Sequence, residues 1–235
     1  MRTGCKIRSF GLIASVLIFA GCATAPRRAA PPTPAQPVPS QPSVGRIFKV
    51  IPSESLLSIF AYRGGTLARA GHNHIIASHD LAGSVHVAAD IARASFELHV
   101  PVAALTVDET VLRAAQGPDF SAEVPESAKE GTRHNMLGAA VLDEEHFHEI
   151  VLTSQSLEGS GQTMLAQVQV QIRGQARTVA VRMTYEVKGD ELKAQGELPL
   201  KQSDLGLAPF SAVLGALQVQ DELKVRFLIR ARAAP

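Results

Sequence analysis

In the stretch TMLAQVQVQIR, residues 163–173, the even-numbered positions carry apolar side chains and the odd-numbered positions carry mostly polar ones. We call these two sets of alternate positions the two parities of the strand. The apolar parity consists of Met164, Ala166, Val168, Val170 and Ile172. The opposite parity includes Gln167, Gln169, Gln171 and Arg173. Because successive side chains of a β-strand point to opposite faces, this pattern predicts a strand with one buried and one solvated face.

Three later segments repeat the alternation, and all three lie close together in the chain. They are ARTVAVRMTYEVK (176–188), ELKAQGELPLK (191–201) and DELKVRFLIRA (221–231). Short turns, RGQA after the first strand and KGDE after the second, join successive strands. Connections this short favour antiparallel hairpins.

The first half of the domain is expected to add further strands and little helix. Strands are predicted at 47–51, 55–63, 73–79, 83–89 and 93–108, the last with a bend at Pro101. Only residues 109–116 and about 122–137 have a helical pattern. A sheet with one apolar face can bury that face in a sandwich or in a closed barrel, which also removes exposed edges. Since helix is scarce, we predict an all-β fold, an eight-stranded antiparallel barrel with one or two short helices, which can hold one small ligand.

The N-terminus has the pattern of an export signal. Residues 1–21 carry Arg2, Lys6 and Arg8 before an uncharged, mostly apolar run that is shorter than the roughly 20 residues of a membrane-spanning helix. The sequence IFAGC that ends at Cys22 resembles the lipobox of bacterial lipoproteins. That resemblance implies a lipidated Cys22 and, because Ala23 follows it, the periplasmic face of the outer membrane. Ordinary soluble secretion is the alternative.

Residues 22–45 hold half of the chain's 14 prolines. Proline-rich segments are extended, at about 3.1 Å per residue, so we predict a tether between Cys22 and one domain, residues 46–235. Cys5 would leave with the signal, and the mature chain would then have no disulfide and no cysteine ligand for a metal.

The charge of the predicted domain argues against nucleic acid as a partner. Residues 1–45 contain five of the chain's 23 basic residues and none of its 22 acidic residues, so residues 46–235 have a formal net charge of −4. No basic stripe stands out.

Three of the eight histidines fall in GHNHIIASHD, residues 71–80. On a strand, His72 and His74 would share a face and His79 would point the other way. Together with His134 from the predicted helix, His72 and His74 could bind a transition metal, and His146 or Glu149 are alternative ligands. Since the chain has no HExxH or paired CxxC pattern, solvated or hydrogen-bonded histidines are the competing interpretation.

Catalysis has less support in the sequence. Ser203 and Asp204 lie in KQSDLG, but nothing resembles the nucleophile elbow that presents a catalytic serine. We therefore predict that the protein is not an enzyme.

Several segments together resemble the YceI family of lipocalin-like, polyisoprenoid-binding periplasmic proteins. In order, they are SLLSIFAYRGG (55–65), HDLAGSVHV (79–87), RHNMLGAAVLDEEHFHEIVLTS (133–154), AQVQVQIRGQARTVAVRMTYEV (166–187), LKQSDLGLAPFS (200–211) and VQDELKVRFLIRA (219–231). The chain departs from the family pattern at residues 112–131, which look like an insertion, and at His148, where the family commonly has proline.

The resemblance implies an apolar barrel cavity that holds a polyisoprenoid or a similar fatty amphiphile. Strand parity suggests as its wall Phe60, Tyr62, Phe96, Leu98, Val168, Val170, Met183, Tyr185 and Phe227. The leading hypothesis is a lipid-anchored periplasmic binding protein without a cofactor. A histidine-based metal-binding or redox accessory protein of the envelope is the alternative, and the sequence leaves a homodimer open.

Overall fold

The computed structural model describes residues 45–235 of the 235-residue chain. The predicted signal peptide, Cys22 and the predicted tether as far as residue 44 lie outside the described residues.

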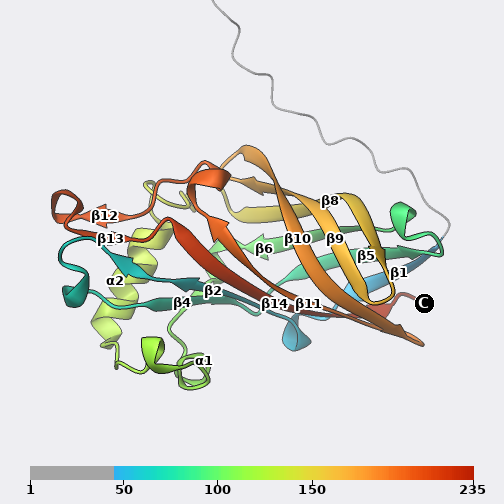
Figure 1. Cartoon of the computed structure of the whole chain (residues 1–235), viewed down its shortest axis with the longest axis horizontal. Helices are drawn as coiled ribbons and strands as arrows, with labels where there is room; N and C mark the ends of the chain where they lie inside the picture. Colours follow the sequence, from blue (N-terminus) through green and yellow to red (C-terminus); the bar gives the residue numbers. More distant parts are fainter. Residues whose placement is uncertain (1–44) are drawn as a thin grey trace, which may run out of the picture. The chain divides into compact units, whose positions relative to one another are not determined.

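Eight antiparallel strands form a closed barrel, in which β14 pairs with β1 to complete the circle (Figure 1). In barrel order these strands are β1 (Gly45–Val50), β5 (Ala82–Ala88), β6 (Ser95–Pro101), β8 (Glu149–Ser160), β9 (Thr163–Ile172), β10 (Gln175–Lys188), β11 (Glu191–Lys201) and β14 (Glu222–Ala233). The predicted all-β, lipocalin-like barrel is confirmed. Because the circle is closed, none of these eight strands is left with a free edge.

At one end of the barrel a branch of three strands extends the wall. The C-terminal end of β14 pairs with β1, whereas its N-terminal half pairs with β2 (Leu56–Ala61). Next to β2 lie β4 (His74–Ser78) and β7 (Thr106–Val107). A separate small sheet contains β3 (Arg63–Gly64), β12 (Ser211–Ala212) and β13 (Leu217–Val219). The interior therefore has different walls at its two ends.

The described residues contain two α-helices, α1 (Thr110–Ala114) and α2 (Glu126–Leu137), within the two segments predicted to be helical. Seven 3₁₀ turns complete the elements: η1 (Pro52–Glu54), η2 (Ala68–Ala70), η3 (Ile91–Arg93), η4 (Val102–Ala104), η5 (Pro118–Phe120), η6 (Ser203–Leu205) and η7 (Val213–Gly215). The strand predicted at 93–108 is interrupted, since β6 ends at Pro101 and η4 separates it from β7. Within residues 45–235, neither helix has the length and apolar character needed to cross a bilayer.

The parity predicted for residues 163–173 is confirmed, because Met164, Ala166, Val168, Val170 and Ile172 are all buried. The neighbouring strand β8 was not identified from alternation, and its register explains why. An irregularity between Ser154 and Ser156 shifts the pairing with β9. A bulge of this kind places two residues opposite one and reverses the parity beyond it, so Leu152 and Leu157 both face the interior although they differ in parity.

Candidate functional site

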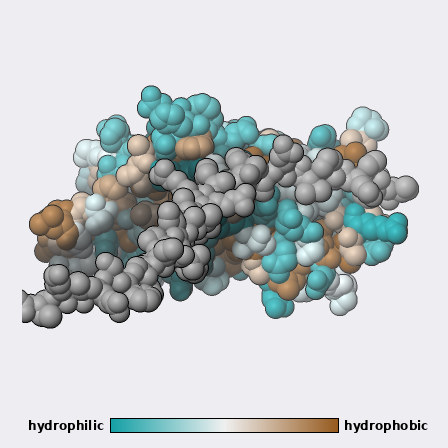
Figure 2. Space-filling model, turned by 90° about the horizontal axis from the view of Figure 1, so that it is seen from above, coloured by the Kyte–Doolittle hydropathy of each residue, from teal (hydrophilic) through white to brown (hydrophobic). Residues whose placement is uncertain are grey.

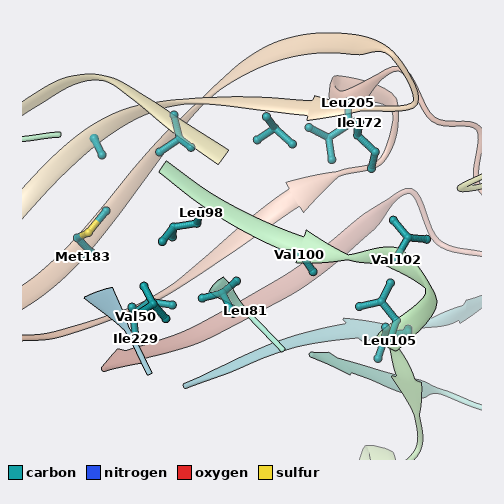
Figure 3. Close-up of a cluster of buried hydrophobic side chains, with 14 of the residues drawn as sticks. Val50, Leu81, Leu98, Val100, Val102, Leu105, Ile172, Met183, Leu205 and Ile229 are labelled. Atoms are coloured by element: carbon teal, nitrogen blue, oxygen red, sulfur yellow. The ribbon is translucent and has the colours of Figure 1, made fainter. Parts of the chain in front are cut away.

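The barrel encloses an apolar cavity of about 170 Å³, which we call the inner chamber. Its walls come from β5, β6, β8 to β11, β14 and β2, and include Phe96, Leu98, Met183 and Phe227. In Figure 3, Leu98, Met183 and Ile229 lie on three different strands, and Leu81 lies just before β5; all four line this space. Every side chain of the wall is apolar except for the Tyr185 hydroxyl, so the inner chamber suits hydrocarbon rather than a polar ligand.

Gly196 makes room for one wall residue of the inner chamber. It lies directly across from Phe227 in the pairing of β11 with β14. A Cβ at Gly196 would come within 2.7 Å of the Phe227 ring and 2.8 Å of the Arg182 carbonyl oxygen. The absence of a side chain therefore lets the Phe227 ring lie against the sheet.

A second cavity of about 550 Å³, the outer chamber, adjoins the first. Five residues line both chambers: Leu57, Leu152, Val170, Leu200 and Val225. Val100, Leu105, Ile172 and Leu205, seen in Figure 3, belong to the outer chamber alone. The two chambers are thus adjacent, one inside the closed barrel and the other under the β2–β4 branch and α2.

Polar side chains are confined to the outer chamber. They are Arg63, His72, His74, Thr132, Asn135, Gln202 and Gln218. Neither an aspartate nor a glutamate is among the described residues that line it. The whole space is therefore amphiphilic, with hydrocarbon walls along most of its length and hydrogen-bonding groups at one end.

Asp108 organises the polar end from behind the wall. It is 1% exposed and has a left-handed backbone, with φ of 56°. Its carboxylate accepts from His74 Nδ1 at 2.6 Å, the Ile75 backbone N–H at 2.9 Å and Arg113 Nη1 at 2.6 Å. Burial by itself would raise the pKa of Asp108, but these three hydrogen bonds outweigh it and hold the pKa below its ordinary value.

Arg113 connects this carboxylate to the segment that the sequence marked as an insertion. The Arg113 side chain is 9% exposed and also donates to the backbone carbonyls of Asn73 at 2.8 Å and Ala122 at 2.8 Å. Its guanidinium lies 5.7 Å from the centre of the Phe120 ring. Residues 112–131 therefore form a folded cover that fixes the loop before β4.

His74 links the buried carboxylate to the outer chamber. Because Asp108 accepts at Nδ1, that nitrogen carries a proton, while Nε2 lies 3.2 Å from Thr132 Oγ1 on α2. The His72 ring lies 6.2 Å from the His74 ring in an edge-on arrangement. The prediction that these two histidines share a face agrees with their joint presence in the lining.

Seven of the nine predicted wall residues line the inner chamber: Phe96, Leu98, Val168, Val170, Met183, Tyr185 and Phe227. Phe60 and Tyr62 are corrections, because they lie outside the lining of both chambers. Leu57, Ile59 and Ala61 face the cavity instead, and Phe60 packs with Ile75 and Phe120 in a second apolar cluster that Tyr62 joins. The prediction turned the wrong face of β2 toward the cavity, because Phe120 of the insertion also buries the opposite face of this strand.

The histidine-based metal alternative gains no support from the geometry. His134 is exposed on α2 and does not line the outer chamber. Among residues 45–235, no three histidine, cysteine or acidic side chains are grouped so that they could hold a metal ion. A metal at His72, His74 and His134 stays a prediction that metal analysis of the purified protein would test.

The remaining histidines lie on outer surfaces beside carboxylates. His79 is 3.1 Å from Glu109, and His146 is 2.8 Å from Asp143, whose hydrogen bond raises the His146 pKa. His99 lies between Glu97 and Glu149, and although partial burial would lower its pKa, the two carboxylates raise it. These contacts lie outside the lining of both chambers.

The KQSDLG segment forms a turn and not a nucleophile site. Ser203 Oγ donates to Asp221 Oδ2 at 2.6 Å, and the Ser203 backbone N–H donates to Asp221 Oδ1 at 2.9 Å. These bonds hold the pKa of Asp221 below its ordinary value. The hydroxyl therefore joins η6 to the start of β14, away from both chambers.

Comparison with known proteins agrees with this architecture. Residues 51–231 match the model of the YceI-like domain. BcnA from Burkholderia cenocepacia has a similar structure, with a TM-score of 0.56 and 17% identity over 77% of this chain and 98% of that chain. A domain from Saccharophagus degradans, described as polyisoprenoid binding and implicated in plant cell wall breakdown, has a TM-score of 0.53 and 10% identity over 80% and 98%. No curated protein gives a significant match.

Proposed function

The chain belongs to the YceI-like family, and we propose that it binds a polyisoprenoid or similar amphiphilic lipid, with the hydrocarbon in the inner chamber and the head group in the outer chamber. The single observation that carries this proposal is that an apolar cavity and a cavity with polar groups lie side by side and share five lining residues. The solved Saccharophagus degradans domain described as polyisoprenoid binding supports the same class of ligand.

The size of the outer chamber supports occupation by a ligand. Protein interiors are close-packed, with few voids larger than a water molecule. A space of about 550 Å³ lies in the range of small-molecule sites and is too large for a packing defect. Hydrocarbon that enters it from water gains about 0.8 kcal/mol per buried methylene. Binding without chemical conversion is the simplest function of such a space, and we propose a carrier and not an enzyme.

Native mass spectrometry of the protein, extracted gently from its own cells, tests the proposal. We expect a bound species whose mass matches an isoprenoid or another long-chain amphiphile. Delipidated protein should also take up added geranylgeraniol in a one-to-one complex. A protein that carries no lipid from cells and binds neither geranylgeraniol nor palmitate would contradict the proposed function.

We also propose that Cys22 carries a lipid anchor that holds the domain at the periplasmic face of the outer membrane. The support is the signal pattern of residues 1–21 and the sequence IFAGC before the tether. Cys22→Ala should move the protein from the membrane fraction to the soluble periplasmic fraction, since no other atom there can take the diacylglyceryl group. Mature wild-type protein whose Cys22 carries no diacylglyceryl group in mass spectrometry would exclude this anchor.

A further inference from the structure

The polar end of the outer chamber contains a fixed positive charge. Arg63 lines the chamber, and its Nη1 donates to the Gly71 carbonyl oxygen at 2.8 Å. That bond uses one of the five N–H donors of the guanidinium, and no carboxylate within residues 45–235 pairs with Arg63. Arg63 therefore faces the chamber as a cation with free donors.

The loop that carries Arg63 is held in place by several contacts. The Arg63 backbone N–H donates to Asn73 Oδ1 at 3.0 Å, and Asn73 Nδ2 donates to the Asp119 carbonyl oxygen at 2.9 Å. The insertion thus fixes the position of this loop from the outside. A pre-positioned cation loses less conformational entropy when it binds a ligand than a mobile side chain does.

The other polar groups add hydrogen-bond capacity without negative charge. His72 forms no hydrogen bond with the residues that the structure describes, and its ring stands beside His74 in the lining. The Thr132 hydroxyl and the Asn135 amide line the same end. The nearest buried carboxylate, Asp108, is already compensated by Arg113 at 2.6 Å. An anion would therefore meet donors and a cation, whereas an amine would meet a like charge.

We propose that this end of the outer chamber binds an anionic head group, a phosphate or a carboxylate, with Arg63 as its counter-ion and His72 and Asn135 as further donors. The inference rests on the proposed lipid binding and specifies the lipid class for the same site. The Arg63 side chain is exposed at the edge of the lining. Charge-assisted hydrogen bonds are about twice as strong as neutral ones.

Matched lipids with the same chain and different heads test this inference on delipidated protein. Geranylgeranyl phosphate should bind at least about tenfold more tightly than geranylgeraniol, and geranylgeranylamine should bind most weakly. Palmitate compared with hexadecanol gives the same contrast for a carboxylate and distinguishes the two anions. Arg63→Gln should reduce the preference for phosphate over alcohol to below about threefold.

Arg69→Gln is the control, because Arg69 is an exposed arginine on η2 that does not line the chamber. It should retain the full preference. The ratio of two affinities within one variant does not depend on the fraction that is folded. Equal affinities for the alcohol and both anions would overturn the head-group assignment and leave lipid binding intact. If none of the lipids binds, the proposed function falls as well.

A second observation concerns the tip formed by η7. Val213 is 65% exposed and Leu214 is 108% exposed, and both have a left-handed backbone, with φ of 52° and 53°. That conformation is uncommon for any residue with a side chain and is a clear outlier for β-branched valine. Strain of this kind is kept where a function requires the exposed geometry.

The apolar tip adjoins residues that line the outer chamber. The Leu67 backbone N–H donates to the Ala216 carbonyl oxygen at 2.7 Å, and Leu67 is itself 48% exposed. Immediately after η7, Leu217, Gln218 and Val219 line the outer chamber. Figure 1 places β12 and β13 at the end of the domain away from the C-terminus, and Figure 2 shows an apolar patch at that end.

We infer that the tip formed by Leu67, Val213 and Leu214 inserts into a lipid bilayer, from which the outer chamber takes its ligand. Arg69, two residues after Leu67, is exposed and can contact anionic lipid head groups. The occupant of this surface is a membrane, because its exposed apolar side chains lead directly in the chain into Leu217, Gln218 and Val219, which line a space with lipid-like walls.

Flotation with vesicles of phosphatidylethanolamine and phosphatidylglycerol tests this inference, using Cys22→Ala protein so that no anchor contributes. The double variant Val213→Ser, Leu214→Ser should lower the vesicle-bound fraction by about tenfold. Val111→Ser, at an exposed valine on α1, should leave it unchanged. Unchanged flotation of the double variant, or a tip-dependent dimer in sedimentation without vesicle binding, would overturn the inference.

Discussion

The inner chamber and the polar end of the outer chamber are built in different ways. The inner chamber is made mainly by barrel strands in which each inward residue is two positions from the next. The polar end depends on β3, β4, α2, the loop between β3 and β4, and the insertion at 112–131. One region is a repeated local pattern, and the other is an assembly of contacts between distant parts of the chain.

The two regions also differ in what stabilises them. The inner chamber is stabilised by apolar burial, which is non-directional and does not depend strongly on exact geometry. The polar end relies on a buried carboxylate with three donors, where the loss of any partner leaves an uncompensated group. We therefore expect substitutions in the first region to act on ligand capacity and substitutions in the second to act on stability and head-group choice.

The largest effect is expected where the chambers join. Val170 lines both chambers and is buried, whereas its neighbour Gln169 lies on the outer parity of β9. Val170→Asp places an unpaired carboxylate in an apolar wall, and it should cost about 4 kcal/mol or more in unfolding free energy, or prevent folding. Lipid should no longer copurify with any folded fraction.

Gln169→Asp is the matched control and should change the unfolding free energy by no more than about 0.5 kcal/mol. Urea denaturation and native mass spectrometry measure both quantities. Equal damage from the two substitutions would mean that lipid binding does not depend on the interior face of β9.

The sequence predicts the barrel and most of the inner wall because both depend on local alternation. Residues 163–173 and 176–188 show the alternation directly, and their inward residues line the cavity. Strand β8 is not predicted in this way, because its bulge interrupts the alternation. Phe60 and Tyr62 were misassigned because their burial comes from Phe120, about 60 residues away, which no local pattern reveals.

The polar end was only partly predictable. The cluster GHNHIIASHD identified His72 and His74 as unusual, but the sequence contains no signal that pairs His74 with Asp108. Asp108 lies just before the insertion and Arg113 at its start, in a stretch without a recognisable motif. A charged pair of this kind can be recognised only from the folded structure. The sequence alone therefore suggests the histidines as metal ligands.

The next largest effect is expected at Asp108. Asparagine keeps the size of the side chain and tolerates the left-handed backbone, but its amide would present donors to Arg113 or His74. Asp108→Asn should lower the unfolding free energy by about 3 kcal/mol, because it leaves a buried guanidinium without its partner. Urea denaturation measures this loss.

Asp119→Asn, at an exposed position in the same insertion, should have no measurable effect. An Asp108→Asn protein as stable as wild type would show that the buried cluster does not stabilise the insertion. The polar end of the outer chamber would then not depend on the buried Asp108 carboxylate for its stability.

Acid should weaken the polar end before the barrel. The pKa of Asp108 is lowered in the folded protein, so its ionised form contributes stability above the unfolded pKa of about 3.8. That contribution is lost as the pH falls through the lower, folded pKa. Between pH 5 and pH 2.5, wild type should therefore lose more unfolding free energy than Asp108→Asn. Parallel loss in both proteins would assign the acid sensitivity to other carboxylates, such as Glu197 and Asp221.

The smallest effect is expected from partial filling of the inner chamber. Val179 lines it from β10, and Thr178 points to the outer face of the same strand. Val179→Phe should occupy space that a ligand chain would otherwise use, at a cost of about 0.8 kcal/mol for each methylene displaced. Affinity for geranylgeraniol should fall roughly tenfold, while affinity for the shorter geraniol should change little, because a short chain does not need the full length of the cavity. Thr178→Phe should leave both affinities unchanged. An unchanged affinity for both chains would mean that the hydrocarbon does not extend into the inner chamber, and that the outer chamber alone holds the ligand.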